Sequence, residues 1–165
     1  YKRQGVLNLV AEKSKWFTKK LKPNQGRGFA IHESFGSWTA QVVEITMNKD
    51  NTFSIDNVYA TVDCGIVINP DGVKAQMEGC IVYGLTSTLA GELTIENGAV
   101  QQSNFHDFQL LSIDQMPKIH TYIVESSENP TGAGEPGLPP IAPALGNAIF
   151  NATGKRLRKL PFSLT

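Results

Sequence analysis

The spacing of apolar residues near the start of the chain predicts an amphipathic helix from Gly5 to Lys20. Apolar residues recur there at intervals of three and four, and charged residues occupy the other face. The apolar set is Val6, Leu7, Val10, Ala11, Trp16 and Phe17, and the charged set is Glu12, Lys13, Lys15 and Lys19. Pro23 and Gly26 are typical of a helix end. Residues 1–23 are therefore predicted to be an N-terminal helix and its end.

The next segment has the β-branched composition of strands. Gly28–Ile31 and Ser37–Met47 are predicted strands, and the polar turn Asn48–Asn51 leads the second of them back into Phe53–Val62. This pattern predicts a β-hairpin. The nearly continuous apolar run at the end of the third strand, extended by Ile66–Ile68, is typical of a strand buried on both faces.

A second helix is predicted to begin at Asn69–Asp71. Asparagine is a favoured N-cap, proline suits the first helical position, and an acid in the first turn complements the helix dipole. Gly79 and Gly84 are small positions where another backbone or a ligand can come near, and Gly91 is the expected stop. Apolar residues recur every four positions in between, at Val73, Met77, Ile81, Leu85 and Leu89.

The remaining strand signals are one short hairpin and one further strand. Leu93–Ile95 and Ala99–Gln101 flank an Asn-Gly pair, which is a strong hairpin signal, and Ile119–Glu125 is a predicted strand. Strands and helices do not alternate regularly, which argues for an α+β fold with a mixed, largely antiparallel sheet and two to three packed helices. At 165 residues without a long linker, residues 1–165 are expected to form a single domain.

Composition and charge narrow the classes of partner. Fifteen basic and fifteen acidic residues give zero formal net charge, and no basic stretch is interleaved with aromatic residues, so nucleic acid is not expected as a partner. No apolar run approaches the roughly 20 residues that cross a bilayer, so no membrane span is expected either. The start of the chain has no signal-peptide pattern, which leaves the compartment open. Cys64 and Cys80 are predicted to be buried thiols, because their spacing suits neither a metal knuckle nor a disulfide framework.

One carboxylate, Glu135, lies inside a loop rich in glycine and proline, Thr131–Pro140. Glycines let a backbone approach a ligand closely, and prolines fix φ and remove amide donors. After the loop, apolar residues recur at helical spacing, at Ile141, Ala144, Leu145, Ala148, Ile149 and Ala152. Cations follow at the C-terminal end, where the helix dipole favours positive charge: Lys155, Arg156, Arg158 and Lys159. Glu135 is therefore expected just before a helix N-terminus. A proline-rich connector with a solvated glutamate explains these local features equally well.

Other motifs that could carry chemistry are weaker. Histidine and carboxylate adjoin at His32-Glu33 and within Asn104–Asp107, but neither place has the repeated ligand spacing of a zinc or non-haem iron site. No direct protein ligand to a metal is therefore expected. The sequence has no G-x-S-x-G motif, Walker loop or dinucleotide fingerprint. The remaining candidates are Glu135, the segment Asp63–Pro70, and the polar residues Gln76 and Glu78.

Four segments together carry a more specific signal. They are D-C-G-I-V-I-N-P (Asp63–Pro70), Q-M-E-G-C-I-V-Y-G-L (Gln76–Leu85), N-F-H-D-F (Asn104–Phe108) and G-A-G-E-P-G-L-P-P-I-A-P-A (Gly132–Ala144). In order and interval they resemble the C-terminal part of the molybdenum-binding subunit of the xanthine oxidase and aldehyde oxidoreductase family. Within this family, the residues around Glu135 are most similar to those of isoquinoline 1-oxidoreductases. The resemblance spans about Gly26 to the C-terminus.

This resemblance implies a molybdenum hydroxylase, an oxidoreductase that uses molybdopterin, in its simple or cytosine dinucleotide form, with molybdenum. In that family a glutamate is the general base when an N-heteroaromatic or aldehyde substrate is hydroxylated with water-derived oxygen. Glu135 stands at the position of this glutamate. Gln76 matches a position that hydrogen-bonds the pterin, and Gly134 is implied to lend backbone to the same pocket.

The resemblance also implies partners, because the first half of the family's molybdenum site and its iron-sulfur domains have no counterpart in this chain. The implied partners are the rest of the molybdenum-binding subunit and a 2Fe–2S subunit or domain, and this chain alone is expected to be inactive. A rival hypothesis is a binding or assembly module that keeps the fold without the chemistry. A fragment is expected to expose apolar surface, and Trp38 and Leu138–Leu145 are candidates for it, although a core position explains each equally well.

Overall fold

Three α-helices and six β-strands form within residues 1–164, the part of the chain that the computed structural model describes. The helices are α1 (Lys2–Lys13), α2 (Pro70–Leu89) and α3 (Ile141–Thr153). The strands are β1 (Gln25–Ser34), β2 (Ser37–Met47), β3 (Phe53–Asp63), β4 (Ile95–Glu96), β5 (Ala99–Val100) and β6 (Lys118–Ile123), and a 3-10 turn covers Ile113–Gln115.

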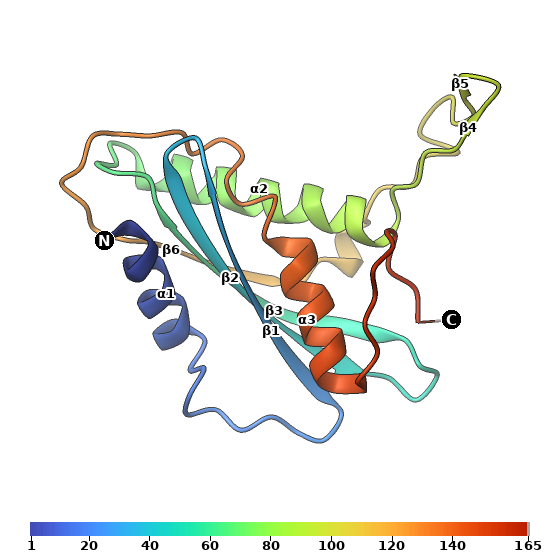
Figure 1. Cartoon of the computed structure of the whole chain (residues 1–165), viewed down its shortest axis with the longest axis horizontal. Helices are drawn as coiled ribbons and strands as arrows, with labels where there is room; N and C mark the ends of the chain where they lie inside the picture. The colour runs from blue at the N-terminus through green and yellow to red at the C-terminus, as the bar shows by residue number, and fades with distance from the viewer. Residues whose placement is uncertain (165) are drawn as a thin grey trace.

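A four-stranded sheet in the order β1-β2-β3-β6 is the centre of the fold (Figure 1). The first three strands form an antiparallel meander in which Val43 lies opposite Gly28 on one side and Val58 on the other. β6 lies parallel to β3, with Ile119 opposite Val58. Parallel pairing needs a crossover, and α2 and the β4–β5 hairpin supply it. The predicted α+β class with a mixed, largely antiparallel sheet is confirmed.

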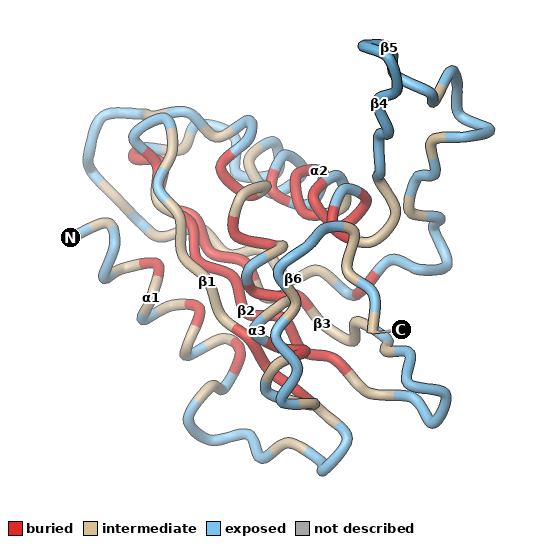
Figure 2. The backbone as a smooth tube through the Cα atoms, turned by 45° about the vertical axis from the view of Figure 1, so that its right-hand side comes forward, coloured by how far each residue is buried: buried red, intermediate tan, exposed pale blue. Residues whose placement is uncertain are grey.

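Helices cover both faces of the sheet (Figures 1 and 2). Because neighbouring residues of a strand point to opposite faces, β2 gives Val42 to one face and Val43 to the other. Val6 and Val10 of α1 pack on the first face. The second face meets α2 and α3 in a larger core of Val43, Ile45, Val58, Ala60, Val62, Met77, Ile81, Leu85, Ile141, Ala144, Leu145, Ala148 and Ile149. Each buried Val, Leu or Ile side chain contributes roughly 1.5–3 kcal/mol, so apolar burial holds the layers together.

The predicted start and face of α2 are confirmed. Asn69 caps the helix, because its side-chain oxygen accepts a hydrogen bond from the backbone N–H of Gly72 at 3.1 Å. The fully buried side chains of the predicted apolar stripe are Met77, Ile81 and Leu85. This stripe fixes how the helix is rotated and leaves Gln76 exposed on the outer side. No helix within residues 1–164 is long and apolar enough to cross a bilayer.

The first helix is shorter than predicted. It begins at Lys2 and ends at Lys13, and Lys15 then takes a left-handed conformation with φ 53° that a helix cannot contain. Trp16 consequently packs on the sheet, with its ring edge against Phe29 at a centroid distance of 6.4 Å. The prediction that the helix reaches Lys20 is therefore wrong, because packing of Trp16 against the sheet outweighs the helical spacing.

The predicted strand at Ile66–Ile68 is also wrong. Gly65 has φ 76° and turns the chain out of the sheet, and the N–H of Ile66 bonds to the carbonyl of Glu128 at 2.9 Å. A side chain at Gly65 would overlap the Asn129 carbonyl oxygen. Ile66 and Ile68 are exposed instead of buried.

The third helix packs closely on the sheet at Gly28, where a Cβ atom would overlap the carbonyl oxygen of Ala144. The helix ends at Thr153, and Gly154 follows in a left-handed conformation with φ 73°. The sequence pattern suggested that the basic residues of Lys155–Lys159 load the end of this helix. They lie beyond Gly154 instead, and the last helical turn contains no basic residue.

Residues 91–117 form an arm whose part around the β4–β5 hairpin extends away from the sheet and helices (Figure 1). Its last part returns to them, since Leu111 packs against the core and its N–H bonds to the Thr86 hydroxyl at 3.2 Å. The large exposed apolar side chains of the arm are Leu93, Ile95, Val100, Phe105, Leu110, Ile113 and Met116. The two surface candidates named from sequence are elsewhere: Trp38 packs in the cluster under α1, and Ile141 and Leu145 are fully buried. The main exposed apolar surface of the described chain is therefore the arm.

We expect the chain to self-associate through this arm. Replacing Phe105 and Ile113 together by serine should weaken the association, while unfolding stability changes by about 0.5 kcal/mol or less because both side chains are exposed. Sedimentation velocity across a concentration series measures it. Phe17→Ser, at a side chain 88% exposed outside the arm, is the control. Association that the arm substitutions leave unchanged contradicts the prediction.

Candidate functional site

The loop Thr131–Pro140, called the Glu135 loop below, contains no helix or strand and lies against β2. Three buried side chains at alternate positions of β2 donate hydrogen bonds to its carbonyl oxygens. They are Ser37 to Gly132 at 2.6 Å, Thr39 to Pro136 at 2.8 Å, and Gln41 to Gly137 at 2.6 Å. Alternate strand residues share a face, so the loop runs along one side of β2.

The other side of the loop rests on α2. The Cys80 thiol donates a hydrogen bond to the carbonyl oxygen of Gly134 at 3.0 Å. Gly137 packs so closely on the helix that a Cβ atom there would lie 3.0 Å from Cys80 Cβ and 3.1 Å from Met77 Sδ. Burial is the main reason that the pKa of Cys80 is raised, and the Glu135 carboxylate raises this pKa further. The thiol therefore keeps its proton and remains a donor to the loop.

Glu135 is exposed although its neighbours Pro136 and Gly137 are buried. Its backbone carbonyl accepts the N–H of Leu138 at 2.9 Å. Its carboxylate has no hydrogen-bond or ion-pair partner within the described residues 1–164. The backbone at this position is thus fixed while the carboxylate is free to meet a group outside the chain.

The three residues implied from sequence border one part of the surface. Cys80 contacts Gly134, and Gln76 lies one helical turn before Cys80, where side chains four residues apart are neighbours. Gly134 and Gly79 are both exposed, and a Cβ atom built on either would meet no atom within 4 Å. We call the surface formed by Gln76, Gly79, Gly134 and Glu135 the Glu135 face.

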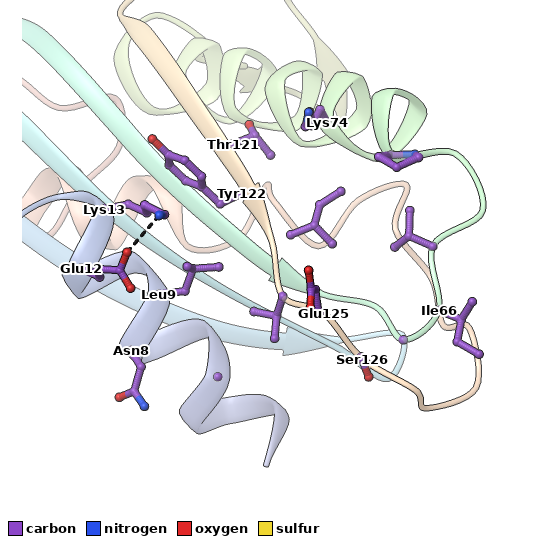
Figure 3. A pocket seen from close by; sticks show the side chains of 16 residues that line it. Asn8, Leu9, Glu12, Lys13, Ile66, Lys74, Thr121, Tyr122, Glu125 and Ser126 are labelled. Carbon is purple, nitrogen blue, oxygen red and sulfur yellow. Dashed lines mark hydrogen bonds and ion pairs between the residues drawn. The ribbon is translucent and has the colours of Figure 1, made fainter.

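A groove of about 1030 Å³ lies elsewhere, between α1, β6 and the start of α2 (Figure 3). Its charged lining residues are Glu12, Lys13, Lys74 and Glu125. Two of them, Lys13 and Glu12, pair with each other at 2.9 Å. The lining contains none of the residues of the Glu135 face. The candidate site is therefore an open face on the far side of the sheet from α1, and not the groove between α1 and β6.

The histidine and carboxylate pairs named from sequence stay outside this site. Asp107 accepts the backbone N–H groups of Asn104 and Ser103, each at 2.9 Å, and these bonds lower the pKa of its carboxyl group. In the arm, the Nε2 atom of His106 lies 3.5 Å from the Oδ2 atom of Asp107. Within residues 1–164, no three His, Cys, Asp or Glu side chains lie together as a possible metal site. Asp107 therefore organises a loop of the arm.

Ser37, Thr39 and Gln41 are the site residues that sequence reasoning missed. All three are fully buried, and they continue the same strand face that carries Val43 and Ile45. A signal was present, because a buried strand face with three polar residues at alternate positions needs hydrogen-bond partners from another element. The sequence alone does not say which element supplies them.

Comparisons with known proteins agree with this architecture. Residues 5–117 match the family model described as a molybdopterin cofactor-binding domain; Gln76 lies inside the matched segment, and Gly134 and Glu135 lie beyond it. The chain is 40% identical over 162 residues to isoquinoline 1-oxidoreductase subunit beta from Brevundimonas diminuta, covering 95% of this chain and 20% of that protein.

A second relative is the membrane-bound aldehyde dehydrogenase of Gluconacetobacter polyoxogenes, whose name specifies pyrroloquinoline quinone. It is 32% identical over 165 residues, covering 97% of this chain and 21% of that protein. Among solved structures, the aldehyde oxidoreductase from Desulfovibrio desulfuricans superimposes with a TM-score of 0.63 at 24% identity, over 76% of this chain and 14% of that one. The chain thus spans about a fifth of the length of these two relatives.

Two glycines of the Glu135 loop should respond oppositely to substitution by alanine. Gly137→Ala should lower the stability of this chain by about 1–3 kcal/mol, because the added methyl group meets Met77 and Cys80. Gly134→Ala should leave stability unchanged, or raise it by less than about 1 kcal/mol, because its methyl group meets open space. Chemical denaturation of both variants measures the difference. The reverse order of stability would show that the loop lies differently on α2.

Proposed function

The chain belongs to the family of molybdopterin cofactor-binding domains, and from this membership we propose that it forms one wall of a molybdenum hydroxylase active site. In this proposal the Glu135 face meets the pterin cofactor, and Glu135 is the general base. The two relatives, which are 40% and 32% identical to the chain, are named as an oxidoreductase and a dehydrogenase and are about five times as long. We therefore propose that residues 1–165 are the C-terminal portion of a larger molybdenum-binding subunit.

The residues of the Glu135 face fit a pterin cofactor. Gly79 and Gly134 lack side chains at exposed positions with no atom of this chain near them, so a flat ring system can approach the backbone there. Gln76 offers an amide group that has no partner within residues 1–164, and it can both donate to and accept from a pterin. The observation that best supports the proposal is the open space at Gly134, which lies beside the unpaired amide of Gln76 and the unpaired carboxylate of Glu135.

Molybdopterin with molybdenum, when bound, supplies the redox centre that accepts two electrons from the substrate. Glu135 then acts through one carboxylate oxygen, which accepts the proton lost by the water-derived oxygen that attacks the substrate carbon. The loop supports this task, because its backbone is held on both sides of Glu135 by Cys80 and Thr39. A positioned general base of this kind typically contributes about 10²- to 10⁴-fold to the rate.

The proposed substrate is an N-heteroaromatic compound or an aldehyde. The names of the two relatives mention isoquinoline and aldehyde. Both kinds of compound contain an electron-poor carbon beside a nitrogen or oxygen atom. The rest of the pocket comes from the remainder of the subunit in this proposal, and a 2Fe–2S subunit or domain removes the electrons. The chain alone is expected to be inactive, because one open face cannot enclose a cofactor.

The proposal predicts that Glu135→Gln in the complete enzyme keeps the fold and the bound cofactor but loses activity by about 10⁴-fold or more. Glutamine keeps the size of the side chain but cannot accept the proton, and loss of orientation adds to loss of basicity. Turnover per molybdenum measures the effect. Glu78→Gln is the matched control, because Glu78 is another exposed carboxylate, on α2.

Gln76→Ala separates cofactor binding from proton transfer. It should lower molybdenum occupancy while each loaded enzyme molecule keeps its base. If Glu135→Gln retains more than about a tenth of wild-type turnover per molybdenum, a difference of only about 1.4 kcal/mol, the general-base assignment is wrong. A complete protein that holds no molybdenum and shows no turnover would instead favour the non-catalytic binding or assembly module.

A further inference from the structure

We propose that Ser37, Thr39 and Gln41 of β2 are positioning residues that hold the Glu135 loop in its working conformation. This inference rests on the proposed function of Glu135 and adds three residues to it. The three side chains do not reach the Glu135 face themselves. They act through the carbonyl groups of Gly132, Pro136 and Gly137.

The part of the loop around Glu135 depends on side chains because its own backbone makes few hydrogen bonds. Within Ala133–Gly137, the backbone-to-backbone hydrogen bond that forms is the one from Leu138 N–H to the Glu135 carbonyl. The carbonyl groups on either side of Glu135 are instead satisfied by Cys80, at Gly134, and by Thr39, at Pro136. Buried carbonyl groups need partners, so these donors select the loop conformation. They bracket the one residue whose direction matters for proton transfer.

The chemical type of the three β2 residues points to the same role. The same strand face continues with Val43 and Ile45, so apolar side chains would satisfy the core at these positions. Gln41 is fully buried, and its Oε1 atom has no hydrogen-bond partner among the described residues. An unpaired buried acceptor lowers stability. A buried glutamine with one unpaired end is therefore better explained by its bond to Gly137 than by core packing.

Thr39→Val tests the role, because valine keeps the shape and removes the hydroxyl group. In this chain, amide hydrogen exchange at Gly132 and Leu138, which donate backbone hydrogen bonds, should become about two- to tenfold faster, since one hydrogen bond to the loop is lost. In the complete enzyme, kcat should fall at least about tenfold with little change in KM, since the base is misplaced while substrate contacts remain. Thr39→Ser should restore both values.

Thr61→Val is the matched control. Thr61 is also fully buried, and its hydroxyl donates to the carbonyl of Val6 at 2.9 Å, but on the face covered by α1. It should lower global stability as Thr39→Val does, while loop exchange and kcat stay at wild-type values. If Thr39→Val does not fold, Ser37→Ala is measured in the same way.

The outcomes separate this inference from the proposed function. If Thr39→Val and Thr61→Val behave alike in loop exchange and in kcat, β2 has only a structural role and the inference is overturned, even where Glu135→Gln abolishes turnover. If Thr39→Val loosens the loop but kcat is unchanged while Glu135→Gln is inactive, the hydrogen bonds do not position the base, and the inference is again wrong. Loosening together with loss of kcat, rescued by serine, supports it.

Discussion

The hydrogen bonds from β2 to the Glu135 loop are the constraint on which the proposed site depends. A segment without helix or strand has to find partners for its carbonyl groups, and here side chains of the sheet and of α2 provide them. The bonds from Thr39 and Gln41 are buried, so water competes little with them. A loop rich in glycine and proline can therefore hold the backbone of one exposed glutamate in a fixed place.

The layers of the fold explain why this place faces outward. α1 closes one face of the sheet, and α2 and α3 close the other, with the loop wedged beside α2 at the end of the second layer. The apolar stripe of α2 sets the rotation of that helix and leaves Gln76 on the same outer side as Gly134 and Glu135. Burial on the inner side of α2 thus determines which residues are available on the outer side.

Local patterns predicted most of the elements, and long-range contacts explain the differences. The bounds of β2 and the cap of α2 at Asn69 depend on nearby residues, and both were predicted. The end of α1 depends on the contact of Trp16 with Phe29 of the sheet, and the turn at Gly65 depends on the Asn129 carbonyl. Both are contacts between distant parts of the sequence, so local patterns did not predict them. Glu135 was a candidate from its glycine- and proline-rich loop, and the family resemblance supplied its role. The loop partners of Thr39 and Gln41 lie 97 and 96 residues away, beyond any local pattern.

The Glu135 face is proposed to bind a molybdenum cofactor. Anomalous X-ray diffraction at a molybdenum edge, from crystals of the complete cofactor-loaded subunit, locates the metal directly. We predict that the metal lies on the exposed side of Glu135, where the carboxylate would lie within hydrogen-bond reach, roughly 2.6–3.2 Å, of the proton that it accepts. A metal in the groove between α1 and β6, or on any side that the Glu135 carboxylate does not face, would contradict the account.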